Sequence, residues 1–223
     1  NAYTDTDVLE QNAEERMERY WDEKFLDYKP KGKLSALRNI SDIVESSYDF
    51  LWLMAIADLM NSYEAPDTIT FDEMACMMIA NAWELFCLLP EAKEKESQLA
   101  ECVDFLIEES KEFMDIELTK ATPKDIVYEA IKDYPMANVF EDTVEELVKR
   151  SPFMVLKAWY PDSDLMERIE KSSNYEDNCL YSITLRKNDP YITVNPKSKR
   201  SLMYDHDSLI HFLQIQYKEY YSI

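Results

Sequence analysis

Apolar residues recur at helical spacing over most of this chain, with polar and charged residues between them. The widest apolar stripe covers residues 43–59, and Ser41 is predicted to be its N-cap. A second helix is predicted to start at Thr70, because Thr70 and Glu73 have the spacing of a capping box, and Pro90 is predicted to end it. Further helices are expected over residues 8–28, 91–117, 123–133, 141–150, 164–171 and 208–221.

The pattern changes only near the end of the chain. Residues 180–186 (LYSITLR) and 191–194 (YITV) are rich in β-branched and aromatic residues, which predicts a β-hairpin at about 180–195. The fold class is therefore predicted to be mainly α: a multi-helix body with one late β-hairpin followed by a C-terminal helix. Two units are expected, an N-terminal helical extension over residues 1–45 and a helical scaffold domain over residues 46–223.

Glycine is almost absent, and this excludes several kinds of chemistry. A typical chain carries about 7% glycine, whereas this chain of 223 residues has only Gly32. The dinucleotide-binding turn G-x-G-x-x-G, the phosphate-binding P-loop and the G-x-S-x-G nucleophile elbow each need several glycines. None of these three motifs can be built from this sequence.

Acidic residues outnumber basic ones by 45 to 24, which gives a net charge of −21 and a pI near 4.4. As a whole, such a chain is a poor partner for duplex DNA or for an anionic membrane. Residues 184–200 depart from this background, since they carry five basic residues and only one acid. The candidate contact residues for a nucleic acid or a protein partner are Arg186, Lys187, Lys197, Lys199 and Arg200. The same side chains could instead keep a sheet edge soluble and unpaired.

The segment from Phe71 to Cys87 (FDEMACMMIANAWELFC) is rich in sulfur. Its Met74, Met77 and Met78 share a helical face, and thioethers can bind Cu(I). The same face continues with alanine, leucine and phenylalanine, and methionine and free cysteine are common in cores. We therefore expect a central buried helix here. The four cysteines form no C-x-x-C pair and are predicted to be buried free thiols in a reducing, cytoplasmic compartment.

Histidine, the usual residue for acid–base catalysis and metal binding, occurs only as His206 and His211. The run Asp205, His206, Asp207 could ligate a metal, but a helix start with acids at its positive end is the preferred interpretation. Because the two histidines are five residues apart, their rings point in different directions on a helix. We expect no catalytic, cofactor-binding or metal-ligating residue, no cofactor and no membrane-spanning segment; enzymatic activity is the less favoured hypothesis.

A family pattern is carried by five segments in order. They are SYDFLWLMAIADL (47–59), ITFDEMACMMIANAWELF (69–86), SPFMVLKAWYPD (151–162), CLYSI…YITVNP (179–196) and DHDSLIHFLQIQYKEY (205–220). Together they resemble the non-catalytic N-terminal part of bacterial HNH-endonuclease-domain proteins, over roughly residues 45–221. In that family a nuclease with histidines around a divalent metal follows the last of these helices. This chain carries no such motif, so the resemblance implies a scaffold and transfers no catalytic residue.

These observations leave three functional hypotheses. The first is a non-catalytic acidic helical interaction module, a scaffold related to HNH-type nuclease proteins, that binds a protein partner or a nucleic-acid complex. The second is an acidic inhibitor that imitates DNA, with the acids of residues 91–117 in place of phosphates. The third is a fragment of a longer HNH endonuclease. The sequence leaves three roles open: a defence component, a phage counter-defence protein, or a remnant.

Overall fold

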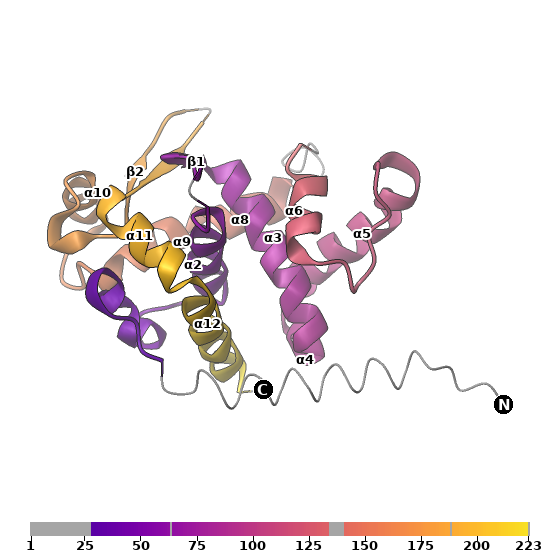
Figure 1. The fold of residues 1–223 in the computed structure, drawn as a ribbon, viewed down its shortest axis with the longest axis horizontal. Coiled ribbons are helices and arrows are strands. Elements are labelled where there is room, and N and C mark those ends of the chain that lie inside the picture. Colours follow the sequence, from indigo (N-terminus) through magenta and orange to yellow (C-terminus); the bar gives the residue numbers. More distant parts are fainter. Residues whose placement is uncertain (1–27, 63, 134–140, 188, 223) are drawn as a thin grey trace.

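Glycine-poor segments with apolar residues at helical spacing form helices through most of the protein (Figure 1). The computed structural model describes residues 28–62, 64–133, 141–187 and 189–222. The helix predicted over residues 8–28 lies almost entirely outside the described residues. The helical elements, with 3₁₀ helices written η, are η1 (Gly32–Asp42), α2 (Tyr48–Leu59), α3 (Phe71–Leu88), α4 (Pro90–Lys95), α5 (Ser97–Phe113), α6 (Lys124–Ile131), α8 (Glu141–Lys149), α9 (Ser151–Met154), η2 (Val155–Ala158), α10 (Leu165–Ser173), η3 (Glu176–Asn178), α11 (Pro196–Tyr204) and α12 (His206–Tyr221).

The predicted late hairpin is present, and a third strand joins it. Strands β2 (Tyr181–Thr184) and β3 (Tyr191–Val194) pair antiparallel, and β1 (Thr68–Thr70) pairs antiparallel with the other side of β3. The register aligns Ile69, Ile192 and Ile183 across the sheet, and all three are buried. Strand β1 was not predicted, because it is only three residues long and leads directly into α3. The predicted fold class, mainly α with a late hairpin and a C-terminal helix, is confirmed.

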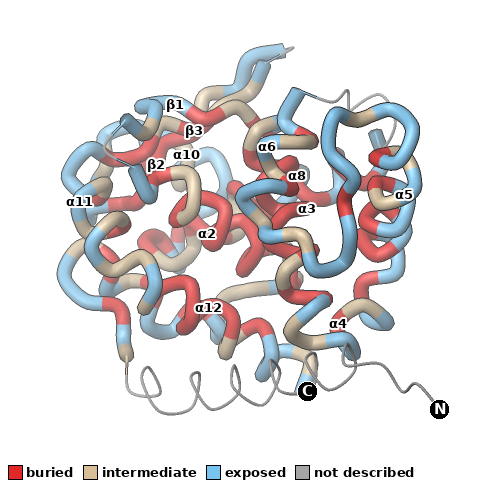
Figure 2. Tube along the Cα trace, turned by 45° about the vertical axis from the view of Figure 1, so that its right-hand side comes forward, coloured by how far each residue is buried: buried red, intermediate tan, exposed pale blue. Residues whose placement is uncertain are grey.

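The two helices α2 and α3 form the centre of the molecule. Both are buried almost all round, and α12 packs on α2 while α6 and α8 pack on α3. Figure 2 shows buried residues concentrated along these central helices. Trp52 of α2 packs edge-on against both Phe71 and Tyr181, so it joins the helix pair to the sheet. The structure thus confirms that the segment from Phe71 to Cys87 is a central buried helix.

The predicted boundaries of α3 are also confirmed. The Thr70 hydroxyl accepts a hydrogen bond from the Glu73 amide at 3.2 Å, and the Glu73 carboxylate accepts one from the Thr70 amide at 2.7 Å. At the other end the helix stops at Leu88, and Pro90 starts the short helix α4. Proline suits this position because it has no amide hydrogen to leave unsatisfied.

Two expectations about helix boundaries were wrong. Ser41 does not cap the helix that contains residues 48–59; it lies inside η1, and α2 begins only at Tyr48. The single helix expected over residues 91–117 is instead two helices, α4 and α5, with Glu96 between them. The break is stabilised by tertiary contacts of Glu96, which local periodicity does not encode.

Part of the predicted N-terminal extension belongs to the described residues. The helix η1 contacts α11 and η2, and its Leu34, Leu37 and Ile40 are fully buried in the same core as α2 and α3. The division of the chain at residue 45 stays a prediction. What the structure adds is that residues 32–42 contribute apolar side chains to the common core.

Candidate functional site

The five basic residues predicted to make contacts do not form one patch. Arg186 and Lys187 follow β2 and lie in its turn to β3, whereas Lys197, Lys199 and Arg200 lie on α11, which follows the far end of β3. A strand of four residues spans about 10 Å, so β3 holds the two groups apart. In Figure 1 the turn projects at the top of the molecule, and α11 lies well below it. The cluster that the sequence suggests is therefore two separate basic sites.

The turn between β2 and β3 presents its side chains to solvent. Leu185 is 60% exposed, and Arg186 and Lys187 are exposed beside it. The Arg186 guanidinium lies over the ring of Tyr191, with its carbon 5.2 Å from the ring centroid, a cation–π contact that limits its motion. Neither Arg186 nor Lys187 forms an ion pair with a carboxylate of the described residues.

On α11 the basic side chains differ from one another. The Lys199 ammonium contacts the Asp67 carboxylate at 2.5 Å and the Pro66 carbonyl oxygen at 3.1 Å, so it joins α11 to the segment before β1. Arg200 lies over the ring of Tyr204 at 5.6 Å, and Lys197 is exposed. Lys199 is thus held by contacts within the fold, which leaves Lys197 and Arg200 on this side for an outside partner.

His206 is the first residue of α12, which confirms that this run is a helix start. Asp205 occupies the N-cap position, as expected for a helix start, although its side chain makes no capping hydrogen bond. Asp207 lies in the first turn, where an acid interacts favourably with the helix dipole. His211 is buried one turn further on. The two imidazoles lie at successive turns of α12 and do not form a pair.

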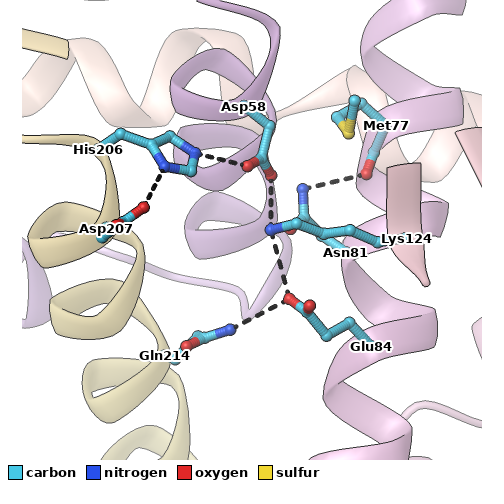
Figure 3. A network of polar contacts seen from close by, with 8 residues as sticks. All are labelled: Asp58, Met77, Asn81, Glu84, Lys124, His206, Asp207 and Gln214. Carbon is cyan, nitrogen blue, oxygen red and sulfur yellow. Dashed lines mark hydrogen bonds and ion pairs between the residues drawn. The ribbon is translucent and has the colours of Figure 1, made fainter. Parts of the chain in front are cut away.

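The structure places His206 in a polar network that the sequence did not reveal (Figure 3). Its Nε2 lies 2.8 Å from Asp58 Oδ1, and its Nδ1 lies 2.9 Å from Asp207 Oδ1. The other Asp58 oxygen lies 3.1 Å from the ammonium of Lys124, at the start of α6. That ammonium is also 3.3 Å from Glu84 Oε2 on α3. The network therefore joins four helices, α2, α3, α6 and α12.

Two amides complete this network. Asn81 donates to the Met77 carbonyl oxygen at 3.1 Å, and its own oxygen lies 3.3 Å from the Lys124 ammonium. Gln214 lies on α12 eight residues after His206 and donates a hydrogen bond to Glu84 Oε2 at 3.4 Å. Asn81 and Gln214 are both buried, so each has an internal partner in place of water.

The opposite charges in the network favour the ionised forms of Asp58, Lys124 and His206. Burial opposes ionisation of Asp58, but the hydrogen bond from His206 and the charge of Lys124 outweigh it, and the pKa of Asp58 is lowered. Burial also opposes the charge of Lys124, but Asp58 and Glu84 outweigh it and raise the pKa of the ammonium. For His206 the hydrogen bonds to Asp58 and Asp207 overcome the effect of burial and raise its pKa.

These protonation states suit attachment of helices more than catalysis. A general base needs a free lone pair and a nucleophilic lysine needs to lose its proton. Here the cationic forms of His206 and Lys124 are the ones that the carboxylates favour. Within the described part of the chain, no group of three or more histidine, cysteine and acidic side chains is arranged to hold a metal ion.

The buried thiols lie in environments that disfavour the reactive thiolate form. Burial raises the pKa of Cys76 and of Cys102 to about 12, and that of Cys179 to about 11. These three cysteines are buried as expected, but Cys87 is exposed, which corrects the prediction for that residue. Its side chain is at the last turn of α3, where the helix leaves the core. The methionines Met74 and Met78 are fully buried core residues.

A second polar cluster lies at the other end of α12. Glu96, between α4 and α5, is buried and its Oε1 accepts hydrogen bonds from the hydroxyls of Ser47, Tyr217 and Tyr221. Ser47 precedes α2, so this carboxylate joins the start of α2 to the end of α12. We refer to Glu96 and these three hydroxyl residues as the Glu96 cluster.

Several acids of the segment 91–117 are engaged within the fold, which makes them less available to take the place of DNA phosphates than the sequence suggests. Glu96 is buried, Asp104 is paired with Lys93 at 2.6 Å, and Glu108 is paired with Lys111 at 2.8 Å. The break between α4 and α5 also interrupts any continuous row of carboxylates along one helix.

Comparisons of the chain with protein-family models, with curated proteins and with solved structures gave no match. Among the described residues, no helix is both long enough and apolar enough to cross a membrane.

A sequence signal for the network around His206 does exist. Asp58 stands in the otherwise apolar run WLMAIADLM, and Glu84 in ANAWELF. An acid within a run that is apolar on every side must be buried with a partner, because an unpaired buried charge is very costly. The partner itself could not have been identified, since Lys124 and His206 are 66 and 148 residues from Asp58 in the chain.

Proposed function

We propose that this chain is a non-catalytic acidic helical interaction module that contacts its partner through the turn between β2 and β3. The observation that carries the proposal is the turn itself: Leu185, Arg186 and Lys187 are exposed together on a projecting hairpin of a chain with a net charge of −21. An exposed apolar side chain beside two cations can bind a partner that offers both an acidic group and an apolar contact.

The geometry of the turn supports a contact role in a second way. Arg186 is positioned by the ring of Tyr191, so less of its side-chain freedom is lost on binding. The strands on either side are fixed by the sheet register and by the buried Ile183 and Ile192. The turn is thus a solvent-exposed recognition element on a rigid support.

The remainder of the chain fits a scaffold. Asp58 and Lys124 are paired and join α2 to α6, and the buried thiols of Cys76 and Cys102 have raised pKa values. A scaffold related to HNH-type nuclease proteins, acting in a reducing cytoplasmic compartment, agrees with these features and with the segment resemblance. The partner would be an acidic protein surface or the phosphates of a nucleic-acid complex.

The experiment compares two charge reversals that change the net charge equally. One variant carries Arg186→Glu and Lys187→Glu in the turn; the matched control carries Lys197→Glu and Arg200→Glu on α11. Immobilised wild-type protein is used to capture partners over a salt titration, and each captured partner, together with labelled single-stranded and duplex oligonucleotides, is then titrated against both variants.

We expect the turn variant to bind at least about tenfold more weakly than the wild type, because it removes two cations and introduces two acids at the contact. The α11 variant should bind within about threefold of the wild type, since it changes only the long-range field. Equal losses in both variants would contradict a contact at the turn. A captured basic DNA-binding protein whose affinity rises in both variants would instead support the DNA-mimic hypothesis.

A further inference from the structure

His206 has an arrangement that only one of its protonation states satisfies. A neutral imidazole donates a hydrogen bond from one ring nitrogen and carries a lone pair on the other. In this structure both nitrogens lie within 2.9 Å of a carboxylate oxygen, Nε2 facing Asp58 and Nδ1 facing Asp207. A carboxylate can only accept, so the ring must carry a proton on both nitrogens to make both contacts. With both aspartates ionised, the geometry therefore fits the imidazolium.

We propose that His206 is a protonation-controlled latch: its imidazolium fastens the first turn of α12 to the last turn of α2, and loss of one proton releases that turn. Asp58 lies in the last turn of α2 and His206 is the first residue of α12. On deprotonation one carboxylate would face a lone pair instead of a donor. The neutral ring keeps a single donor, and its hydrogen bond to Asp58 is then no longer charge-assisted; little water can compensate, because the side chains of His206 and Asp58 are only 14% and 8% exposed.

Charged groups from every neighbouring helix bear on this ring. Asp58 of α2 and Asp207 of α12 favour the cation, as does the negative end of the α2 dipole. Lys124 of α6 opposes it, and so does the positive end of α12 itself. Glu84 of α3 pairs with Lys124 and so offsets part of that opposing charge. The two carboxylates in direct contact prevail, and they raise the pKa of His206.

The release is confined to the first turn because the rest of α12 is held independently. Leu213 and Tyr217 are buried against the body, and Tyr217 and Tyr221 bind Glu96 at the far end. Asp205 is the one residue between α11 and α12. Opening the first turn therefore frees the corner between these helices without detaching α12.

The direction of the pH effect follows from the raised pKa. The folded state binds the proton more tightly than the unfolded chain, whose histidine pKa is about 6.5. The latch is complete below that value, and its contribution is lost as the pH rises through the pKa of His206 in the folded protein. Between these two values the opening equilibrium of the first turn increases by as much as about tenfold per pH unit.

The test follows the protonation of His206 and the opening of the turn in the same samples. Nitrogen-15 NMR of the imidazoles gives the titration of His206, which is assigned with His211→Gln because the chain has only these two histidines. Hydrogen exchange, corrected for its intrinsic pH dependence, gives the protection of the Leu209 amide, which donates to the Asp205 carbonyl oxygen at 2.8 Å. The amides of residues 217–221 serve as the internal control.

We expect His206 to titrate above an unstructured histidine and the Leu209 amide to lose protection with the same midpoint, while residues 217–221 stay protected. In His206→Gln, which keeps a donor to Asp58 but cannot titrate, the protection of Leu209 should no longer change with pH. Asp207→Asn alters only an exposed partner and should lower the midpoint of His206. Titration at or below the value of an unstructured histidine would overturn the proposal, as would a midpoint for Leu209 that differs from that of His206.

Discussion

The two ends of α12 are both held by a buried carboxylate on another element, but through different chemistry. At the start of the helix, Asp58 binds the imidazole of His206 and lies 3.1 Å from the ammonium of Lys124. At its end, Glu96 accepts from the hydroxyls of Tyr217 and Tyr221. The first attachment consists of paired charges, and the second of a charge with neutral donors.

This difference decides how each end responds to pH. The attachment at His206 is lost as the pH rises through the raised pKa of the imidazole. The phenols of Tyr217 and Tyr221 have pKa values raised far above 10 by burial and by Glu96, so both remain protonated donors. Their contribution is complete below the unfolded value of about 10 and is constant between pH 6 and 9. One helix thus combines a titratable attachment with a constant one.

The largest loss in the free energy of unfolding is expected from Asp58→Ala. Removal of this carboxylate leaves Lys124 and His206 as partly buried cations with too little compensating charge. Breaking a buried ion pair from one side typically costs about 3–5 kcal/mol, and Asp58 serves two cations at once. We expect a loss of this size in the free energy of unfolding, measured by urea denaturation at pH 6.

Asp104→Ala is the matched control, since it also removes an aspartate from a lysine pair, but at the surface. Surface pairs contribute about 0–1 kcal/mol, so its effect should be several times smaller. The double variant Asp58→Ala, Lys124→Met should recover part of the loss, because it removes one uncompensated charge. A loss from Asp58→Ala no greater than that from Asp104→Ala would show that the network is hydrated and weak.

Glu96→Ala should have the next largest effect. It leaves the hydroxyls of Ser47, Tyr217 and Tyr221 without their acceptor, and buried unsatisfied groups cost about 1–3 kcal/mol each when no water reaches them. Since Tyr221 is partly exposed and can turn to solvent, we expect a loss of about 2–4 kcal/mol in urea denaturation. Unlike the loss at Asp58, it should be the same at pH 6 and at pH 9.

Glu96→Gln separates the charge from the acceptor geometry. The amide keeps one carbonyl oxygen for the hydroxyls, and neutral hydrogen bonds are about half as strong as charge-assisted ones. We therefore expect about half of the loss seen in Glu96→Ala. A loss equal to that of alanine would indicate that the charge of Glu96, rather than its shape, holds the end of α12.

Much of the fold follows from local sequence, and the attachments of α12 do not. The capping box at Thr70, the stop before Pro90 and the hairpin at β2 and β3 depend on residues a few positions apart, so the sequence predicts them. The break at Glu96 depends on Ser47 and on Tyr221, which are 49 and 125 residues away. Periodicity carries no information about such partners, and the segment 91–117 was for this reason predicted as one helix.

The candidate site shows the same limit. The sequence identifies the basic residues of 184–200, because charge is a property of composition. It suggests one patch because neighbours in sequence are assumed to be neighbours in space. The strand β3 is extended and so places Arg186 and Lys197 at opposite ends, and Lys199 on α11 is paired with Asp67 within the fold. The three-dimensional arrangement separates the five candidates into two groups and shows that Lys199 is paired within the fold.

The smallest change in the free energy of unfolding is expected from removing single hydroxyl groups within the Glu96 cluster. The hydroxyl of Tyr221 makes a short hydrogen bond to Glu96, whereas that of Tyr217 lies 3.4 Å away. Tyr221→Phe should therefore lower the free energy of unfolding by about 1–2 kcal/mol, as expected for a hydrogen bond to a charged group. Tyr217→Phe, which removes the same atom from a longer contact, should lower it by less than about 1 kcal/mol. Urea denaturation of the two variants decides the order, and a larger loss for Tyr217→Phe would mean that depth of burial, not hydrogen-bond length, sets the strength of this end of α12.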